Sequence, residues 1–416
     1  MKRSLRRLAA LTVALSAWIS PALAQPSKAE VEQQFQHWIA SDLWPEAQKA
    51  GISQAEFSKA MAGARLIWSL PDLEPPGFPP PKQRPQSQAE FSSPGPYFNE
   101  ARLEGLAVKG RALAKTYAVP LKRIEAKYGV PGPILLALWG RETGYGAAKL
   151  PYRAIDVLAT GAFMSTRKAL FEKELIDAMK IVGDRDIDPA AMLGSSAGAL
   201  GQPQFMPSNF LKYAVDGDGD GHRNIWTSVP DTLASMANFL EHKGWQKGRG
   251  WGFEVTIPAS VSCADEGPDR ARNLEQWLAM GIRPVSPMPF SPKERKAEAM
   301  MLTPAGTHGP EFLVTPNFYV LKEYNNSDLY ALFIGNLADR IARGSGAFSA
   351  PFGPVGHMLR SDVLTMQQKL VAMGYDVGKA DGLAGYKTRR SLGEWQAKAG
   401  FSPTCFPDET LKARLK

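Results

Sequence analysis

A continuous apolar run covers residues 134–139 and leads to a single carboxylate, Glu142. A helix that is apolar on every face is a buried helix, and Gly144 can supply the left-handed backbone that ends it. Burial disfavours the charged form of a carboxylate, so we expect a raised pKa for Glu142. A glutamate that stays protonated near neutral pH can donate a proton to a leaving group, as the acid of a glycosidase does. The alternative is a solvent-exposed glutamate at the end of a helix.

Elsewhere the apolar residues mostly recur at helical spacing. This pattern predicts helices in four stretches: between residues 31 and 67, between 101 and 139, at 156–181 and at 232–243. Ser53 followed by Glu56 is a capping-box pattern, which predicts that a helix begins there. Regular strands are few before Phe253, and the proline-dense segment 71–85 predicts an extended excursion on the surface. The fold is therefore expected to be mainly α-helical.

Residues 1–24 have the three parts of a secretory signal peptide. A basic start precedes a short apolar stretch, and the segment ends in small residues at Ala22 and Ala24. We expect cleavage after Ala24 and, since Gln25 is not a cysteine, no lipid anchor. An uncleaved membrane anchor is the alternative, and no other segment is long and apolar enough to span a bilayer. We expect an exported protein, located in the periplasm if the source is a bacterium.

The distribution of positive charge along the chain indicates which classes of ligand the protein can bind. The chain has 416 residues, enough for two or three domains, and its formal net charge is +8. Four of these charges belong to residues 1–24, whereas residues 358–416 contain ten Lys and Arg against six Asp and Glu. The positive excess of the mature chain therefore lies in its C-terminal segment. This distribution argues against a nucleic-acid-binding protein and favours contact with an anionic polymer.

Glycine and proline mark a boundary near the C-terminus. Residues 343–357 are expected to link a large domain, 25–342, to a small module, 358–416. Cys263 and Cys405 are the only cysteines, and one lies in each of these domains. In an oxidising compartment they can pair and join the two domains, but the sequence leaves this pairing open.

A second segment rich in small residues covers residues 194–208. Small residues let backbones approach closely, the Gln204 side chain offers a donor and an acceptor, and Phe205 and Met206 supply apolar surface. Together they suit the wall of a groove for a ligand rich in hydroxyl and amide groups. The alternative is a glycine-rich turn with a capping serine.

An acidic loop follows, with Asp216, Asp218 and Asp220 at alternate positions and Gly221 at the sixth. This is the start of a calcium-binding loop, since a hard cation needs several oxygen ligands and a tight turn brings them together. Thr227 occupies the twelfth place, where a glutamate usually closes the loop, and Asp231 can close a longer one. A plain acidic turn is the alternative.

The segments around Glu142 and Gln204, with residues 324–330, resemble the lytic murein transglycosylase B family, and the resemblance covers nearly all of the mature chain. It implies a lysozyme-like, mostly helical catalytic domain. It also implies cleavage of the MurNAc-β-1,4-GlcNAc bond of peptidoglycan without water, leaving a 1,6-anhydro-muramyl end. No cofactor is then required for the chemistry, and cell-wall synthesis or division proteins are conceivable partners.

The resemblance also assigns residues. Glu142 matches the single catalytic acid and base of the family. Positions that line the substrate groove are matched by Tyr97, Arg167, Ser195, Gln204, Phe205, Met206, Tyr324, Asn325 and Tyr330. A structural Ca²⁺ would be held by Asp216, Asp218, Asp220, the carbonyl of His222 and Asp231. The chain departs from the family in two places: one extra residue precedes Asp231, and Phe239 stands where the family can carry tyrosine.

The C-terminal module is similar to the peptidoglycan-binding domain found beside many wall hydrolases. The similarity rests on glycine and Asp-Gly turns near Gly374 and Asp381 between amphipathic helices, with Trp395 on a later helix. An unrelated three-helix bundle is the alternative. For the whole chain, two other functions stay open: a muramidase that uses water, and a wall-binding scaffold without turnover.

Overall fold

The computed structural model describes residues 25–80, 94–184, 187–287 and 289–415. The predicted signal peptide, 1–24, and the end of the proline-dense segment, 81–85, lie outside these residues. Residues 71–80 form turns and extended backbone without a helix, and Leu73 makes an isolated bridge to Ser165. No helix in the described ranges has the length and apolarity needed to cross a membrane.

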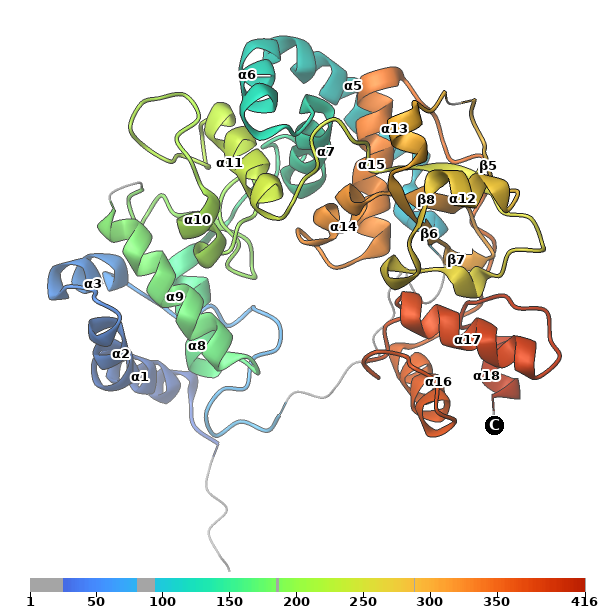
Figure 1. Cartoon of the computed structure of the whole chain (residues 1–416). Helices are drawn as coiled ribbons and strands as arrows, with labels where there is room; N and C mark the ends of the chain where they lie inside the picture. Colours follow the sequence, from blue (N-terminus) through green and yellow to red (C-terminus); the bar gives the residue numbers. More distant parts are fainter. Residues whose placement is uncertain (1–24, 81–93, 185–186, 288, 416) are drawn as a thin grey trace, which may run out of the picture.

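Most of the described chain is helical, as predicted. The helices that precede the sheet lie along an arc, although not in the order of the chain (Figure 1). They are α1 (Lys28–Trp38), α2 (Trp44–Lys49), α3 (Gln54–Met61), α5 (Glu100–Thr116), α6 (Ala118–Tyr128), α7 (Gly132–Thr143), α8 (Ala154–Met164), α9 (Lys168–Gly183), α10 (Pro207–Tyr213) and α11 (Val229–His242). A π-helix, Ile39–Leu43, joins α1 to α2, and a short 3-10 helix, Gly95–Phe98, precedes α5.

Local signals account for several of these boundaries. Ser53 and Glu56 form the predicted capping box at the start of α3. Every residue of α8 is buried, because its sequence is apolar on all faces apart from Asp156 and Thr160. Both polar side chains are satisfied: Asp156 pairs with Arg65 and Arg153, and the Thr160 hydroxyl donates to the Asp156 carbonyl.

A five-stranded antiparallel sheet is inserted between α11 and α14, and the sequence did not resolve it beyond expecting few strands before Phe253. Its order is β4-β6-β8-β3-β5, with Gly252 opposite Val314 at one end of the central β3–β8 pair. The strands are β3 (Gly252–Thr256), β4 (Arg272–Asn273), β5 (Arg283–Pro284), β6 (Glu298–Leu302) and β8 (Glu311–Val314), with β7 (Pro304–Thr307) beside β8. It has its own small core around the buried Trp277, flanked by α12 (Leu274–Ala279) and α13 (Pro292–Arg295).

Two helices after the sheet return to the main core. They are α14 (Pro316–Lys322) and α15 (Asp328–Arg343), and α15 packs against α5 and α7. The segment between α15 and the C-terminal module is not helical, and its aromatic and apolar side chains pack against the main core and the module. Phe348 and Phe352 both pack against Phe98 of the main core, and Val355 packs with Phe406 of the C-terminal module.

The C-terminal module contains α16 (Arg360–Ala372), α17 (Tyr386–Lys398) and α18 (Glu409–Arg414). It has a separate apolar core that includes Val363, Leu370 and Leu392. This confirms the predicted helical module.

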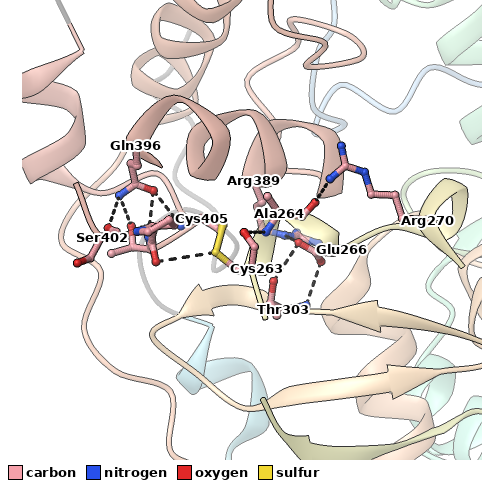
Figure 2. Close-up of a disulfide and its surroundings, with 12 residues drawn as sticks. Cys263, Ala264, Glu266, Arg270, Thr303, Arg389, Gln396, Ser402 and Cys405 are labelled. Atoms are coloured by element: carbon pink, nitrogen blue, oxygen red, sulfur yellow. Dashed lines mark hydrogen bonds and ion pairs between the residues drawn. A yellow bond between two sulfur atoms is a disulfide. The ribbon is translucent and has the colours of Figure 1, made fainter. Parts of the chain in front are cut away.

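A disulfide bond joins the module to the sheet (Figure 2). Cys263 lies in a 3-10 helix, Cys263–Asp265, and Cys405 lies 142 residues later, between α17 and α18. Gly393 of α17 passes directly over the bridge, and a Cβ atom at this position would lie 2.2 Å from the Cys405 sulfur. The pairing that the sequence left open is therefore present, and it links two parts of the chain that the sequence assigns to different domains.

Candidate active site

Helix α7 carries the predicted proton donor to the edge of the main core. Its residues 134–140 are all buried, as the apolar run predicted. Gly144 has φ 59° and ψ 39°, and its N–H donates to the carbonyl of Gly140 at 3.0 Å. The left-handed glycine thus ends the helix one turn after its last buried aromatic residue, Trp139, and leaves Glu142 in the final turn.

Glu142 is partly buried, and its carboxyl Oε1 accepts a hydrogen bond from the hydroxyl of Tyr330 on α15. Burial raises the pKa of Glu142 above its usual value, although the Tyr330 hydrogen bond and the positive charge of Arg141 oppose the increase. The direction of the predicted shift is confirmed. Burial and the nearby Glu142 charge also raise the pKa of Tyr330, so the tyrosine stays protonated and remains the donor.

Arg141 lies next to Glu142 in the chain, but its guanidinium group is held elsewhere. Its Nη2 donates to the hydroxyl of Tyr97 at 2.7 Å. The group also lies over the rings of Tyr97, at 4.7 Å, and Phe333, at 4.8 Å. Such cation–π contacts stabilise the guanidinium where it lies. The sequence assigned Tyr97 to the groove, but it missed Arg141, which connects Tyr97 to the catalytic helix.

The turn around Gln204 is the second part of the candidate site, and we call it the groove wall. Gln204 has φ 55°, a left-handed conformation that is uncommon for a residue with a side chain, and its Nε2 donates to the carbonyl of Gly201 at 2.8 Å. Phe205 is fully buried, with its ring centroid 5.9 Å from that of Tyr324. Met206 directly precedes α10 and is partly buried. Strain of this kind concentrates at functional sites.

Two tyrosines connect this turn to Glu142. The Tyr324 hydroxyl donates to the carbonyl of Pro203 at 2.7 Å, and the Tyr324 ring stacks on Tyr330 with centroids 6.5 Å apart. Tyr330 then donates to Glu142. Phe239, which stands where the family can carry tyrosine, packs edge-on against Tyr324 with ring centroids 5.1 Å apart. It therefore supports this wall through its ring and has no hydroxyl to contribute.

Gln202 is a positioning residue that the sequence did not single out. Its side-chain oxygen accepts from the indole N–H of Trp139 at 2.7 Å, and its Nε2 donates to the carbonyl of Trp226 at 2.9 Å. Its backbone carbonyl accepts from the Thr143 hydroxyl at 3.1 Å. These bonds lock the end of α7 to the Gln204 turn. A buried tryptophan beside the catalytic turn was the available signal, because its N–H needs an acceptor.

Three other predicted groove residues lie apart from the Glu142 group. The Ser195 hydroxyl accepts from the N–H groups of Ala197 and Ala199, so it caps its own turn, which was the alternative considered for this segment. Arg167 is exposed just before α9, with its guanidinium 5.3 Å from the ring of Phe171. Asn325 is exposed in the loop 323–327 between α14 and α15. The structure records no side-chain bond between Glu142 and these three residues.

The acidic loop brings three carboxylates together. Oxygens of Asp216, Asp218 and Asp231 lie within 4.8 Å of one another. Asp231 is fully buried on α11, and burial raises its pKa, although the N–H groups of Gly217 and Asn224 oppose the increase. The Asp220 carboxylate instead accepts the His222 N–H at 2.8 Å. Three convergent carboxylates fit a hard cation such as Ca²⁺, whereas ligation by Asp220 and by the His222 carbonyl stays a prediction.

The chain is similar to known proteins over most of its length. Residues 34–339 match the family described as the transglycosylase SLT domain, and residues 360–415 match a putative peptidoglycan binding domain. Over 229 residues the chain is 34% identical to membrane-bound lytic murein transglycosylase B of Escherichia coli, a match that covers 54% of this chain and 61% of that protein. The chain therefore spans about three fifths of this relative.

Two solved structures are also similar. SltB3 from Pseudomonas aeruginosa in complex with NAG-NAM-pentapeptide is 33% identical, covers 92% of this chain and 99% of its own, and has a TM-score of 0.81. An Escherichia coli lytic transglycosylase in complex with calcium is 26% identical, covers 75% of this chain and 94% of its own, and has a TM-score of 0.58.

Proposed function

The chain belongs to the transglycosylase SLT domain family, and from this premise we propose that it is a lytic murein transglycosylase. Its substrate is the peptidoglycan glycan strand, cut at the MurNAc-β-1,4-GlcNAc bond with formation of 1,6-anhydro-MurNAc. The observation that carries the proposal is one partly buried carboxyl group, Glu142, with a raised pKa and a hydrogen bond from Tyr330. It lies beside the wall formed by Gln204, Phe205 and Tyr324.

The reaction uses this carboxyl group twice. Protonated Glu142 donates its proton to the glycosidic oxygen, the bond from that oxygen to C1 of MurNAc breaks, and positive charge develops at C1. The resulting carboxylate is stabilised by the Tyr330 O–H. It then accepts the proton of the MurNAc C6 hydroxyl as the C6 oxygen bonds to C1. The proton returns to Glu142, and intramolecular attack replaces the bimolecular step with water.

Inverting hydrolysis is less well supported, because it needs a second carboxylate facing a water molecule. Asp156, the nearest spare acid in the sequence, is buried in α8 and paired with Arg65 and Arg153. A scaffold without turnover does not account for a partly buried carboxyl group with a raised pKa at the end of a buried helix. These arguments favour transglycosylation over both alternatives.

Mass spectrometry of digested sacculi tests the proposal. Anhydro-muropeptides are one water lighter than hydrolytic muropeptides, so each mechanism leaves a distinct product. We expect anhydro ends as the main product. Products of hydrolytic mass would support a muramidase, and no soluble product from sacculi would support a scaffold.

Export and a structural cation belong to the same proposal. We propose a periplasmic location, because residues 1–24 have the pattern of a signal peptide and disulfides such as Cys263–Cys405 persist in oxidising compartments. We also propose that Asp216, Asp218 and Asp231 hold Ca²⁺, in line with the calcium in the structure of the Escherichia coli relative. When bound, the cation supplies structural cross-linking and takes no part in the proton transfers.

A further inference from the structure

A cavity of about 750 Å³ lies between the C-terminal module and the loop 323–327. Residues of both parts line it: Tyr97, Asn325 and Ser327 on one side, and Arg360, Lys379 and Tyr386 on the other. Cavities of this size hold small ligands in other proteins. The proton transfers at Glu142 do not use it.

Two residues of the lining connect the cavity to the Glu142 site. Tyr97 lines the cavity and accepts a hydrogen bond from Arg141, the neighbour of Glu142 in the chain. Asn325 also lines it and directly follows Tyr324, which lies in the groove wall. A branched ligand whose main chain lies in the groove can therefore extend a branch into the cavity.

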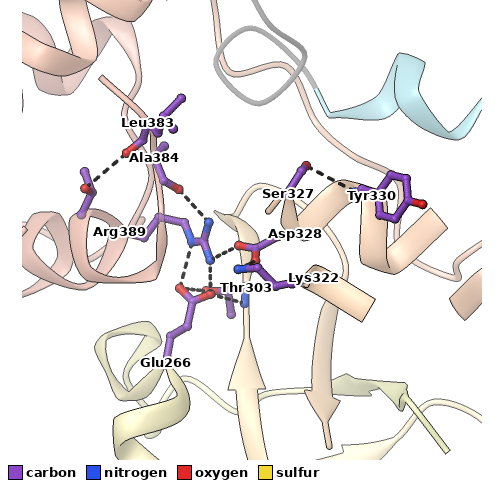
Figure 3. A network of polar contacts seen from close by, with 10 residues as sticks. Glu266, Thr303, Lys322, Ser327, Asp328, Tyr330, Leu383, Ala384 and Arg389 are labelled. Atoms are coloured by element: carbon purple, nitrogen blue, oxygen red, sulfur yellow. Dashed lines mark hydrogen bonds and ion pairs between the residues drawn. The ribbon is translucent and has the colours of Figure 1, made fainter. Parts of the chain in front are cut away.

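The two walls are held together by a buried ion network (Figure 3). Arg389 of α17 donates from Nη2 to Asp328 at 2.8 Å and from Nε to Glu266 at 3.0 Å. Lys322 of α14 donates to the other oxygen of Asp328 at 2.6 Å. With the Cys263–Cys405 bond, this network fixes the module against the loop and leaves the cavity preformed. A preformed site costs less ordering entropy on binding.

Within the network the charges balance, because two cations face two carboxylates. The charge available to a ligand comes from the rest of the lining. Arg360, Lys379 and Lys387 contribute three cations, against one carboxylate, Asp381, and Arg360 donates from Nε to the Asp381 carbonyl at 2.8 Å. Lys387 pairs with the exposed Asp376, outside the lining. The Lys379 ammonium is exposed, and among the described residues no ion pair or hydrogen bond to it is recorded. The module side of the cavity is therefore suited to an anionic, hydrogen-bonding ligand.

We propose that this cavity binds the anionic peptide stem that MurNAc carries on its lactyl group. The inference rests on the proposed function, since a glycan strand in the groove brings such stems to the edge of the cavity. Stem peptides contain free carboxylates, which pair with the exposed Lys379, and amide groups, which suit the exposed Asn325. The module thereby contributes directly to recognition of the substrate that is being cut.

Kinetics on two substrates test this site. We compare Lys379→Glu with Lys398→Glu, which makes the same charge change at an exposed position of α17 outside the cavity lining. The substrates are glycan strands with their stems and the same strands stripped by an amidase. We expect Lys379→Glu to raise KM about tenfold on stem-bearing strands, as loss of one charge-assisted contact does. Both variants should match wild type on stripped strands. Equal KM values for Lys379→Glu and wild type on stem-bearing strands would overturn the proposal, as would equal losses on both substrates.

A binding measurement separates this site from the chemistry. Titration of the intact protein with a free stem tetrapeptide requires no turnover, so it reports on the cavity even if the anhydro product is absent. We expect saturable binding that Leu383→Trp weakens, because Leu383 is partly exposed in the cavity lining and the larger ring fills it. Folding of this variant is checked by its melting temperature. Binding by folded Leu383→Trp with wild-type affinity, or no binding by wild type, would contradict the site.

Discussion

Two carboxylates lie at the start of helix α15, and burial affects both, but their pKa values are shifted in opposite directions. Glu142 faces Tyr330, near the start of the helix, whereas Asp328 is its first residue and lies between Lys322 and Arg389. Burial favours the protonated form of both. The two cations nevertheless hold the pKa of Asp328 well below its usual range, while the pKa of Glu142 is raised. Neighbouring charge thus decides which carboxylate becomes a proton donor and which becomes a structural anchor.

The same comparison explains why Arg141 does not cancel the shift at Glu142. Its guanidinium group is directed to the Tyr97 hydroxyl and to aromatic faces, so Glu142 gains only part of its charge. Arg389, in contrast, donates directly to Asp328, which Lys322 also contacts. Distance and orientation of the cation separate the two outcomes.

Removing the proton donor should have the largest effect. Glu142→Gln keeps the shape of the side chain but has no proton to donate, and we expect turnover of sacculi to fall about a thousandfold or more. Binding to sacculi should persist, because the groove walls and the module are unchanged. Glu125→Gln, at an exposed position of α6, is the control and should retain wild-type turnover. Product release by Glu142→Gln at the control rate would remove Glu142 from its role.

Removing Arg389, the cation that pairs with the buried Glu266, should lower the free energy of unfolding. Arg389→Met leaves Glu266 buried without its cation, and breaking such a buried pair costs about 3–5 kcal/mol of unfolding free energy. Arg390→Met also removes an interdomain ion pair, but its partner Asp269 is 47% exposed, so the loss should be smaller. Denaturant unfolding of the two variants measures the difference. Equal losses would show that burial of the partner does not set the cost.

Changing the hydrogen bond at Glu142 should move the pH profile. Tyr330→Phe removes an interaction that favours the charged form, so the pKa of Glu142 should rise further. Because the reaction needs protonated Glu142, kcat/KM falls as pH rises through this pKa. The alkaline limb should therefore move to higher pH in the variant. We also expect a rate loss of roughly tenfold at the optimum, since the carboxylate intermediate is less stabilised. A limb that stays in place or moves to lower pH would contradict this role of Tyr330.

Binding of Ca²⁺ beside a third carboxylate, Asp231, should have the smallest effect on stability. The buried Asp231 carboxylate accepts the N–H groups of Gly217 and Asn224, and among the described residues no ion pair to it is recorded, so Ca²⁺ would provide the missing charge. At about ten times its Kd, calcium should stabilise the fold by about 1.4 kcal/mol. Differential scanning calorimetry with calcium and with chelator measures this gain, and Asp231→Asn should abolish it. An unchanged melting temperature of the wild type would exclude the site.

The parts that the sequence predicted are those fixed by local pattern. The apolar run and Gly144 determine α7 and place Glu142 at its end, and Ser53 with Glu56 determines the start of α3. The family resemblance supplied Tyr324 and Tyr330, which spacing alone does not bring to Glu142.

The parts that the sequence missed depend on residues far apart in the chain. Arg389 meets Asp328 across 61 residues, and Gln202 meets Trp139 across 63. The residues that flank Arg389 and Gln202 in the sequence do not indicate which distant residue each one contacts. The cysteine pairing was open for the same reason, because geometry, and not spacing, decides it. Ser195 shows the opposite case, since its capping contacts are local and were considered as an alternative.

Titration of the Glu142 carboxyl group tests the central claim most directly. Carbon-13 NMR of protein labelled at the glutamate side-chain carboxyls follows each group with pH, and the resonance lost in Glu142→Gln identifies the one of interest. We predict that this resonance titrates above the usual glutamate range, because burial raises the pKa of the group. A midpoint at or below the usual glutamate value would contradict the account, because the group would then be ionised when it must donate its proton.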